Sequence, residues 1–264
     1  MSDSREATRA AGSLTVVGTG LRPGLQTTPE ARAQITVADR VFYMVGESLA
    51  EGLVQDLAPE AEPLQRFYQE GRPRTECHEA MVEHVLAAVR EGDDVCLVFY
   101  GHPGVFVRPG HQAVRRARTE GFRAVMLPGV SAEDCLFADL GVDPAADGCQ
   151  SFEATSFLHR GYRFDPRCPL VLWQVGITGE LTFTSEYGAP ELPALVERLC
   201  ESYPRHHEVV AYEAAILPLP GAGPRIEKVA LADLAAARLT PCTTLYVPPL
   251  PDVPPLPDVP PLVE

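Results

Sequence analysis

Short apolar runs alternate with amphipathic stretches over the first 140 residues of the chain. Strand-length apolar runs occur at residues 14–17, 40–45, 95–99 and 122–127. Between them, helical patterns occupy residues 29–38, 46–62, 75–91 and 111–120,. Strands that alternate with helices in this way favour a parallel sheet covered by helices on both faces.

The pattern changes near residue 147. Further strand-like runs follow at residues 151–154, 169–175, 208–213, 226–231 and 243–247, with one amphipathic helix at 191–202. These runs predict a second, mixed and more antiparallel α/β domain. We therefore expect an α/β protein of two domains, residues 13–147 and 148–249, with a disordered N-terminus at 1–12 and a proline-rich tail at 250–264,.

Local signals predict where several helices begin and end. Thr28 directly precedes Pro29, which is the arrangement of an N-cap followed by proline in the first turn,. Ser131 and Asp134 have the spacing of a second helix start,. Gly92 is expected to end the helix at 75–91,.

Glycine-containing loops follow three strands of the first half. Gly18-Thr19-Gly20 follows the first strand, Gly-His-Pro-Gly at 101–104 follows the run at 95–99, and Pro-Gly-Val-Ser-Ala at 128–132 follows the run at 122–127. In an open α/β sheet, ligands bind outside the carboxyl ends of the strands. The loops therefore predict a ligand site there. Taken singly, each is also an ordinary strand-to-helix turn, and the first lacks the GxGxxG spacing of a dinucleotide loop.

A second candidate stretch is residues 64–78, where arginines, a tyrosine and a histidine surround Gly71 and Pro73. These two residues prevent a continuous helix. Arg74 and His78 are four residues apart, so they share a face if the next helix begins near them. A solvated surface loop would have a similar composition.

Composition narrows the classes of function. The formal net charge of −14 argues against a nucleic-acid partner, because binding phosphates needs a basic surface,. No apolar run reaches the length of a membrane span, and the N-terminus lacks the apolar core of a signal peptide,. The seven cysteines are scattered without a metal-binding spacing,. We expect a cytoplasmic protein with reduced thiols and no metal site.

Taken together, the loops resemble those of the tetrapyrrole (corrin/porphyrin) methylase superfamily. Within it, residues 99–106 and 127–139 are closest to the borosin peptide backbone N-methyltransferases, and the likeness runs from about residue 14 to residue 249. The resemblance implies an S-adenosyl-L-methionine-dependent methyltransferase with S-adenosyl-L-homocysteine as its product. It further implies α-N-methylation of backbone amides in a ribosomally made precursor peptide, and a homodimeric enzyme.

The resemblance also assigns roles to residues. Tyr68, Arg74 and His78 match catalytic-loop positions, although His78 and Gln65 stand where family members carry tyrosines. A phenolate near a guanidinium is suited to act as a base, so we expect Tyr68 to be the base, Arg74 its electrostatic partner and His78 an orienting or relaying group. The positions implied to bind the cofactor are Gly18, Gly20, Tyr100, His102, Val105, Phe106, Ser131, Ala132, Gln174, Ala214, Thr243 and Thr244.

The proline-rich end of the sequence bears on the substrate. It contains the unit Leu-Pro-Asp-Val-Pro-Pro twice, and a proline nitrogen carries no proton that a methyl group could replace,. We therefore expect the precursor peptide to be a separate chain that binds in trans. Two alternatives stay open. One is a small-molecule, tetrapyrrole-like methylase, which would leave Tyr68 and Arg74 without a task. The other is a catalytically retired homologue that still binds cofactor and peptide.

Overall fold

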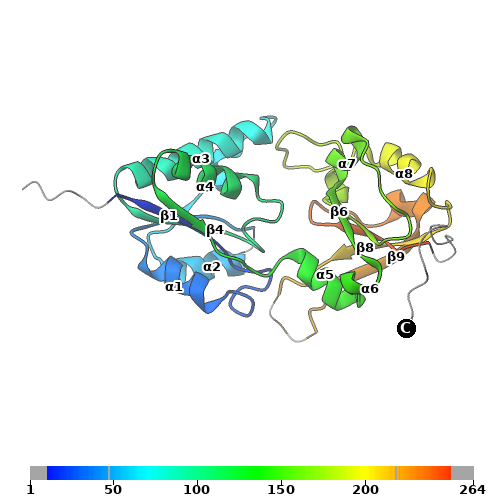
Figure 1. Cartoon of the computed structure of the whole chain (residues 1–264), viewed down its shortest axis with the longest axis horizontal. Helices are drawn as coiled ribbons and strands as arrows, with labels where there is room; N and C mark the ends of the chain where they lie inside the picture. Colours follow the sequence, from blue (N-terminus) through cyan, green and yellow to red (C-terminus); the bar gives the residue numbers. More distant parts are fainter. Residues whose placement is uncertain (1–10, 47, 218, 220, 251–264) are drawn as a thin grey trace, which may run out of the picture. The chain divides into compact units, whose positions relative to one another are not determined.

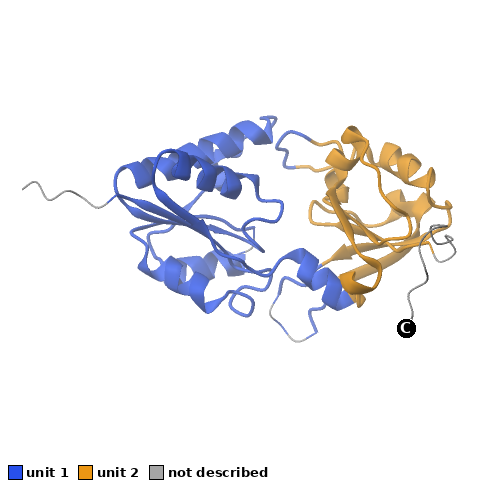
Figure 2. Cartoon of the chain, viewed as in Figure 1, with its two compact units in different colours: residues 1–139, 181–185, 214–224 blue, residues 140–180, 186–213, 225–264 orange. Residues whose placement is uncertain are grey.

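The computed structural model describes residues 11–46, 48–217, 219 and 221–250. The chain divides into two compact units (Figure 2): unit 1 comprises residues 1–139, 181–185 and 214–224, and unit 2 comprises residues 140–180, 186–213 and 225–264. The expected boundary near residue 147 differs from this division in two ways: the first segment of unit 1 ends at residue 139, and two later segments also belong to unit 1. Most of the predicted N-terminus (1–10) and tail (251–264) lies outside the described residues.

Unit 1 contains a five-stranded parallel sheet in the order β3-β2-β4-β1-β5. The central strands are buried on both faces, as a sheet covered by helices on two sides requires,. In register, Val16 of β1 lies opposite Leu97 of β4 and Met126 of β5. The strands are β1 (Ser13–Gly18), β2 (Arg40–Met44), β3 (Glu62–Pro63), β4 (Asp94–Phe99) and β5 (Arg123–Met126).

Helices cover both faces of this sheet (Figure 1). Helices α1 (Pro29–Val37) and α2 (Ser48–Leu57) pack on the face that contains Val17, whereas α3 (Arg74–Arg90) and α4 (Arg108–Thr119) pack on the face that contains Leu14 and Val16. Adjacent β1 residues thus enter different cores, as the alternation of side chains along a strand requires. The predicted parallel α/β architecture is confirmed.

The predicted helix starts of α1 and α5 (Ala132–Leu140) are also confirmed. The Thr28 hydroxyl accepts a hydrogen bond from the Ala31 N–H at 3.1 Å. At α5, the Ser131 hydroxyl accepts the Asp134 N–H at 3.1 Å, and the Asp134 carboxylate accepts the Ser131 N–H at 2.7 Å. This reciprocal pair is a capping box.

Some predicted bounds were wrong. The helix expected over 46–62 ends at Leu57, because Pro59 disfavours helical backbone at the residue before it, and the short strand β3 follows,. The helix expected at 111–120 begins earlier, at Arg108, with Pro109 in its first turn,. The helix expected at 75–91 begins one residue earlier, at Arg74, after the 3-10 turn η1 (Gln65–Phe67).

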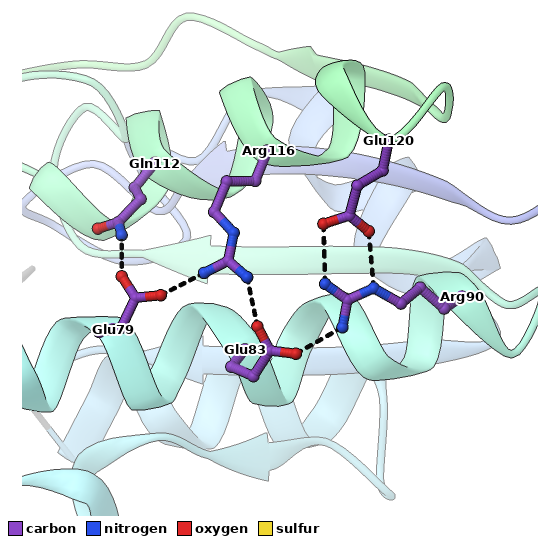
Figure 3. Close-up of polar contacts among 6 residues, drawn as sticks. All are labelled: Glu79, Glu83, Arg90, Gln112, Arg116 and Glu120. Atoms are coloured by element: carbon purple, nitrogen blue, oxygen red, sulfur yellow. Dashed lines mark hydrogen bonds and ion pairs between the residues drawn. The ribbon is translucent and has the colours of Figure 1, made fainter.

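A polar network joins α3 to α4 on the surface of unit 1 (Figure 3). Arg90 contacts Glu83 at 2.6 Å and Glu120 at 2.6 Å, and Arg116 contacts Glu79 and Glu83. Single exposed ion pairs contribute little to stability, but here shared partners connect the pairs. The network holds α4 against the helix whose first two turns carry Arg74 and His78.

Unit 2 contains a mixed five-stranded sheet in the order β6-β7-β10-β8-β9, which confirms the more antiparallel second domain. Only β6 and β7 are parallel neighbours. The short helices α6 (Pro144–Asp147) and α7 (Ala154–Arg160) were missed, because neither is long enough to show a helical period,. The other elements are β6 (Gln150–Glu153), β7 (Leu170–Trp173), η2 (Val175–Ile177), α8 (Leu192–Cys200), β8 (Glu208–Glu213), β9 (Arg225–Ala230), η3 (Leu231–Ala236) and β10 (Thr244–Val247).

Candidate active site

The three glycine-containing loops of unit 1 meet where β1, β4 and β5 end. Gly20 and Gly101 exchange two backbone hydrogen bonds, with N···O distances of 2.9 and 3.3 Å. A Cβ atom at Gly18 would lie 2.0 Å from the Gly101 carbonyl oxygen, and one at Gly129 would lie 3.3 Å from the same oxygen. Glycine is therefore required at position 18, and the loops pack backbone to backbone.

The loop at 100–106 carries most of the predicted cofactor residues of unit 1. Tyr100 and Phe106 are each 47% exposed, so both rings present aromatic surface at this edge of the sheet. The Nδ1 atom of His102 accepts the Gly104 N–H at 2.9 Å. In the neutral imidazole this bond places the ring proton on Nε2, which leaves a hydrogen-bond donor.

Ser131, also predicted to bind the cofactor, caps the start of α5. Its hydroxyl donates to the Asp134 carboxylate at 2.7 Å, and its carbonyl oxygen accepts the Cys135 N–H. Ser131 therefore shapes the loop before Ala132, and its polar groups already have partners within the protein.

Backbone strain marks two of the predicted cofactor residues. Phe106 (φ 56°) and Gln174 (φ 58°) are the non-glycine residues with positive φ among the part of the chain that the structure describes. Left-handed backbone is unfavourable for such residues and persists where the surroundings impose it, frequently at functional sites. One strained residue lies in each unit, and both belong to the predicted cofactor set.

The predicted cofactor residues that come after Gln174 lie directly after the end of β8 and at the start of β10. The Thr243 carbonyl oxygen accepts the Val175 N–H at 3.0 Å, next to Gln174, and Thr244 pairs with Tyr212. Ala214 follows Glu213 at the end of β8 and is counted with unit 1.

The Thr243 hydroxyl donates to the carboxylate of Glu213 at 2.5 Å, and Arg225 contacts that carboxylate at 2.6 Å. Burial would raise the pKa of Glu213, but hydrogen bonds from Arg225, Thr240 and Thr243 outweigh it and lower the pKa. Glu213 is therefore ionised, and its carboxylate holds Arg225, Thr240 and Thr243 together in unit 2.

In the second candidate stretch, the structure brings Tyr68 and His78 together. The Tyr68 hydroxyl lies 3.0 Å from Nε2 of His78, and the two rings meet edge to face. Burial, followed by the positive charges of Arg108 and Arg74, lowers the pKa of His78 from 6.5 to about 4. The imidazole is thus neutral at pH 7, and its Nε2 forms a hydrogen bond with the Tyr68 hydroxyl.

Arg74 and His78 do share the start of α3, as their spacing predicted. After burial and Arg108, the charge of Arg74 also contributes to the lowered pKa of His78, so a cation lies near the Tyr68–His78 pair. A nearby cation also favours the phenolate form of a tyrosine.

A cavity of about 300 Å³ opens beside Tyr68 within unit 1. It is almost wholly apolar and has Tyr68 and Tyr100 in its wall, so a predicted catalytic residue and a predicted cofactor residue face the same space. Gln65, at the other family-tyrosine position, donates its amide to the Val45 carbonyl oxygen at 2.5 Å. The lining residues are Met44, Val45, Gly46, Gln65, Tyr68, Tyr100 and Phe183.

Sequence reasoning missed Phe183 as a lining residue, and also Met44, Val45 and Gly46, which lie at the end of β2 and directly after it. The Phe183 ring stacks on Tyr68 with a centroid distance of 4.7 Å and an interplanar angle of 15°. No pattern near residue 183 indicates a contact with a loop more than 100 residues earlier.

The described residues contain neither a metal-binding cluster nor a membrane-spanning helix. No group of three or more histidine, cysteine, aspartate or glutamate side chains there is arranged to hold a metal ion. Among the same residues, no helix is long and apolar enough to cross a membrane.

Comparison with known proteins identifies the family. The profile of the Tetrapyrrole (Corrin/Porphyrin) Methylases matches residues 13–218. The chain belongs to this family. In fold it is similar to the uroporphyrin-III C-methyltransferase of Thermus thermophilus, solved in complex with S-adenyl homocysteine, with a TM-score of 0.58, 20% identity and coverage of 90% of this chain and 92% of that chain.

Among curated relatives, this tetrapyrrole methylase family member is 41% identical over 246 residues to a protein of Gymnopus fusipes named methyltransferase/ribosomally synthesized cyclic peptide gymnopeptides precursor. It is 42% identical over 245 residues to the corresponding omphalotin A precursor of Omphalotus olearius. The matches cover 91% and 90% of this chain and 58% of each relative. The chain thus spans little more than half the length of these relatives.

Proposed function

We propose that this protein is an S-adenosyl-L-methionine-dependent methyltransferase that methylates backbone amide nitrogens of a peptide. The observation that carries the proposal is the cavity of unit 1, whose wall contains Tyr68, hydrogen-bonded to His78, together with Tyr100 of the loop at 100–106. The names of the relatives from Gymnopus and Omphalotus, which pair a methyltransferase with a peptide precursor, support the choice of substrate class.

The residues at the ends of β1, β4 and β5 suit this cofactor. Tyr100 and Phe106 offer exposed aromatic surface, His102 offers a donor, and the strain at Phe106 indicates that the loop conformation is imposed by its surroundings,. The other proposed cofactor contacts from unit 1 are Val105, Ala132, Gly18 and Gly20. The proposed cofactor contacts from the later part of the chain are Gln174, Ala214, Thr243 and Thr244. When bound, the cofactor supplies a methyl group on a positively charged sulfur.

The protein's own residues must activate the amide nitrogen for methyl transfer. The lone pair of an amide nitrogen is delocalised into the carbonyl group, so the nitrogen is a poor nucleophile until its proton is removed. Tyr68, having lost its own proton to solvent, would take the amide proton as a phenolate, and the nitrogen would then be able to attack the methyl group that the bound cofactor supplies. Arg74 stabilises the phenolate and the negative charge that develops on the amide.

The role of His78 follows from its neutral state. Because its pKa is about 4, the imidazole is a weak base at pH 7 and does not store the proton of Tyr68. Its Nε2 lies 3.0 Å from the Tyr68 oxygen and forms a hydrogen bond with it, which fixes the direction in which the phenol points. His78 is therefore an orienting group.

We further propose that the precursor peptide is a separate chain and that the enzyme is a homodimer. Intact mass of the purified protein after incubation with cofactor alone tests the first point: an unchanged mass, with mass gain in an added precursor peptide, supports binding in trans. Methyl groups gained by residues 250–264 would instead support a substrate on the same chain. Light scattering that gives the mass of a single 28.6 kDa chain at micromolar concentration would contradict the dimer.

A further inference from the structure

Residues 181–185 pair with the backbone of residues 70–74, and we name them the clamp segment. Phe183 forms two backbone hydrogen bonds: its carbonyl oxygen accepts the Gly71 N–H at 2.8 Å, and its N–H donates to the Arg72 carbonyl oxygen at 2.9 Å. The Ser185 N–H donates to the Glu70 carboxylate at 2.8 Å. Although it comes late in the sequence, the clamp segment belongs to unit 1 (Figure 2).

The clamp segment also engages the start of α3. The Leu181 carbonyl oxygen accepts the N–H of Arg74, the first residue of that helix, at 3.3 Å. The first N–H groups of a helix have no partner within the helix itself. The clamp segment therefore satisfies one of them at the residue that we assign as the electrostatic partner of Tyr68.

Phe183 extends this contact to the Tyr68 side chain. The Phe183 ring covers one face of the phenol in a stacked arrangement at 4.7 Å, while His78 holds the hydroxyl at 3.0 Å. The phenol is thus fixed at its face by one segment and at its tip by another. Both Phe183 and Tyr68 line the cavity. The contacts of the phenol ring therefore help to determine how its oxygen is directed relative to that space.

We propose that the clamp segment fixes the loop at 65–78 in its active arrangement and that Phe183 is a positioning residue for Tyr68. This inference rests on the proposed function, because it assigns Phe183 through the task of Tyr68. Offset stacking favours one orientation of the phenol beyond the apolar area that it buries. Displacement of a reacting group by about 1 Å can lower a rate about 100-fold.

The test compares Phe183→Leu with Phe183→Tyr, which keeps the ring. Leucine should lower kcat by about tenfold or more while cofactor affinity stays within about twofold, and tyrosine should restore most of the rate. Phe122→Leu is the matched control, because Phe122 is another partly buried phenylalanine packed against the core of unit 1. The control should lose stability without a comparable loss of kcat.

A second readout does not depend on activity. In protein labelled with ¹³C-tyrosine, the ring signal of Tyr68 is identified by its disappearance in Tyr68→Phe. Phe183→Leu should remove the ring-current shift of that signal, whereas Phe122→Leu should leave it in place. An unchanged kcat together with an unchanged Tyr68 signal in Phe183→Leu overturns the inference. If the wild-type protein transfers no methyl group, the proposed function fails, and the Tyr68 signal alone decides whether Phe183 positions that ring.

Discussion

Replacement of His78 by glutamine is expected to flatten the acid dependence of stability. Folding lowers the pKa of His78 from 6.5 to about 4, because the imidazole becomes buried near Arg108 and Arg74. Between these two pH values the unfolded chain binds a proton at His78 that the folded protein does not bind. Stability that is fully present above pH 6.5 is therefore lost as the pH falls towards 4.

The size of the effect follows from the same two pKa values. One pKa unit corresponds to about 1.36 kcal/mol. Relative to neutral pH, protonation of His78 in the unfolded chain therefore lowers the free energy of unfolding by about 2 kcal/mol at pH 5 and by about 3 kcal/mol below pH 4. Glutamine cannot titrate, and its amide can still accept a hydrogen bond from the Tyr68 hydroxyl. The difference between wild type and His78→Gln should therefore change by about 2 kcal/mol between pH 8 and pH 5.

Urea unfolding followed by far-ultraviolet circular dichroism at several pH values measures this difference. Trp173, the single tryptophan, lies in unit 2, so its fluorescence shows whether both units lose stability together,. His206→Gln is the control, since it removes an exposed histidine, and its pH dependence should follow that of the wild type. If the stability of His78→Gln falls with pH as steeply as that of the wild type, His78 is not held neutral by burial, and its assigned role fails.

Two further predictions concern the site and its loops. Arg74→Lys should keep cofactor affinity in calorimetry but lower kcat severely, because a point charge does not replace a planar guanidinium; an unimpaired rate would remove Arg74 from the mechanism. Gly18→Ala should lower the free energy of unfolding by about 2–3 kcal/mol, because its Cβ would meet the Gly101 carbonyl oxygen at 2.0 Å, whereas Gly52→Ala in α2, with open space around it, should gain up to about 1 kcal/mol,. Equal effects of the two substitutions in chemical denaturation would contradict the packing of these loops.

The sequence was sufficient for the architecture of the sheet because each signal was local. β1 and β4 are buried on both faces, so their residues read as continuous apolar runs,. Helix starts were equally predictable from the sequence, because the side chains of Thr28 and Ser131 each accept a hydrogen bond from the N–H only three residues later. The two-residue strand β3 was missed because it is too short for any period to appear.

Contacts between distant segments were not predictable from such patterns. The stacking of Phe183 on Tyr68 and the pairing of the clamp segment with residues 70–74 join parts of the chain more than 100 residues apart. The spacing of Arg74 and His78 placed both at the start of α3, but it gave no sign that His78 would be neutral. That property depends on burial and on Arg108, which comes from α4.

The most direct test of the central claim is localisation of transferred methyl groups. Wild type and Tyr68→Phe are incubated with S-adenosyl-L-methionine and a candidate precursor peptide, and the peptide is sequenced by tandem mass spectrometry. We predict that the wild type adds mass in steps of one CH₂ to backbone nitrogens, and that Tyr68→Phe binds the cofactor equally well but loses most of this transfer. Methyl groups on side chains, or undiminished backbone transfer by Tyr68→Phe, would contradict this prediction.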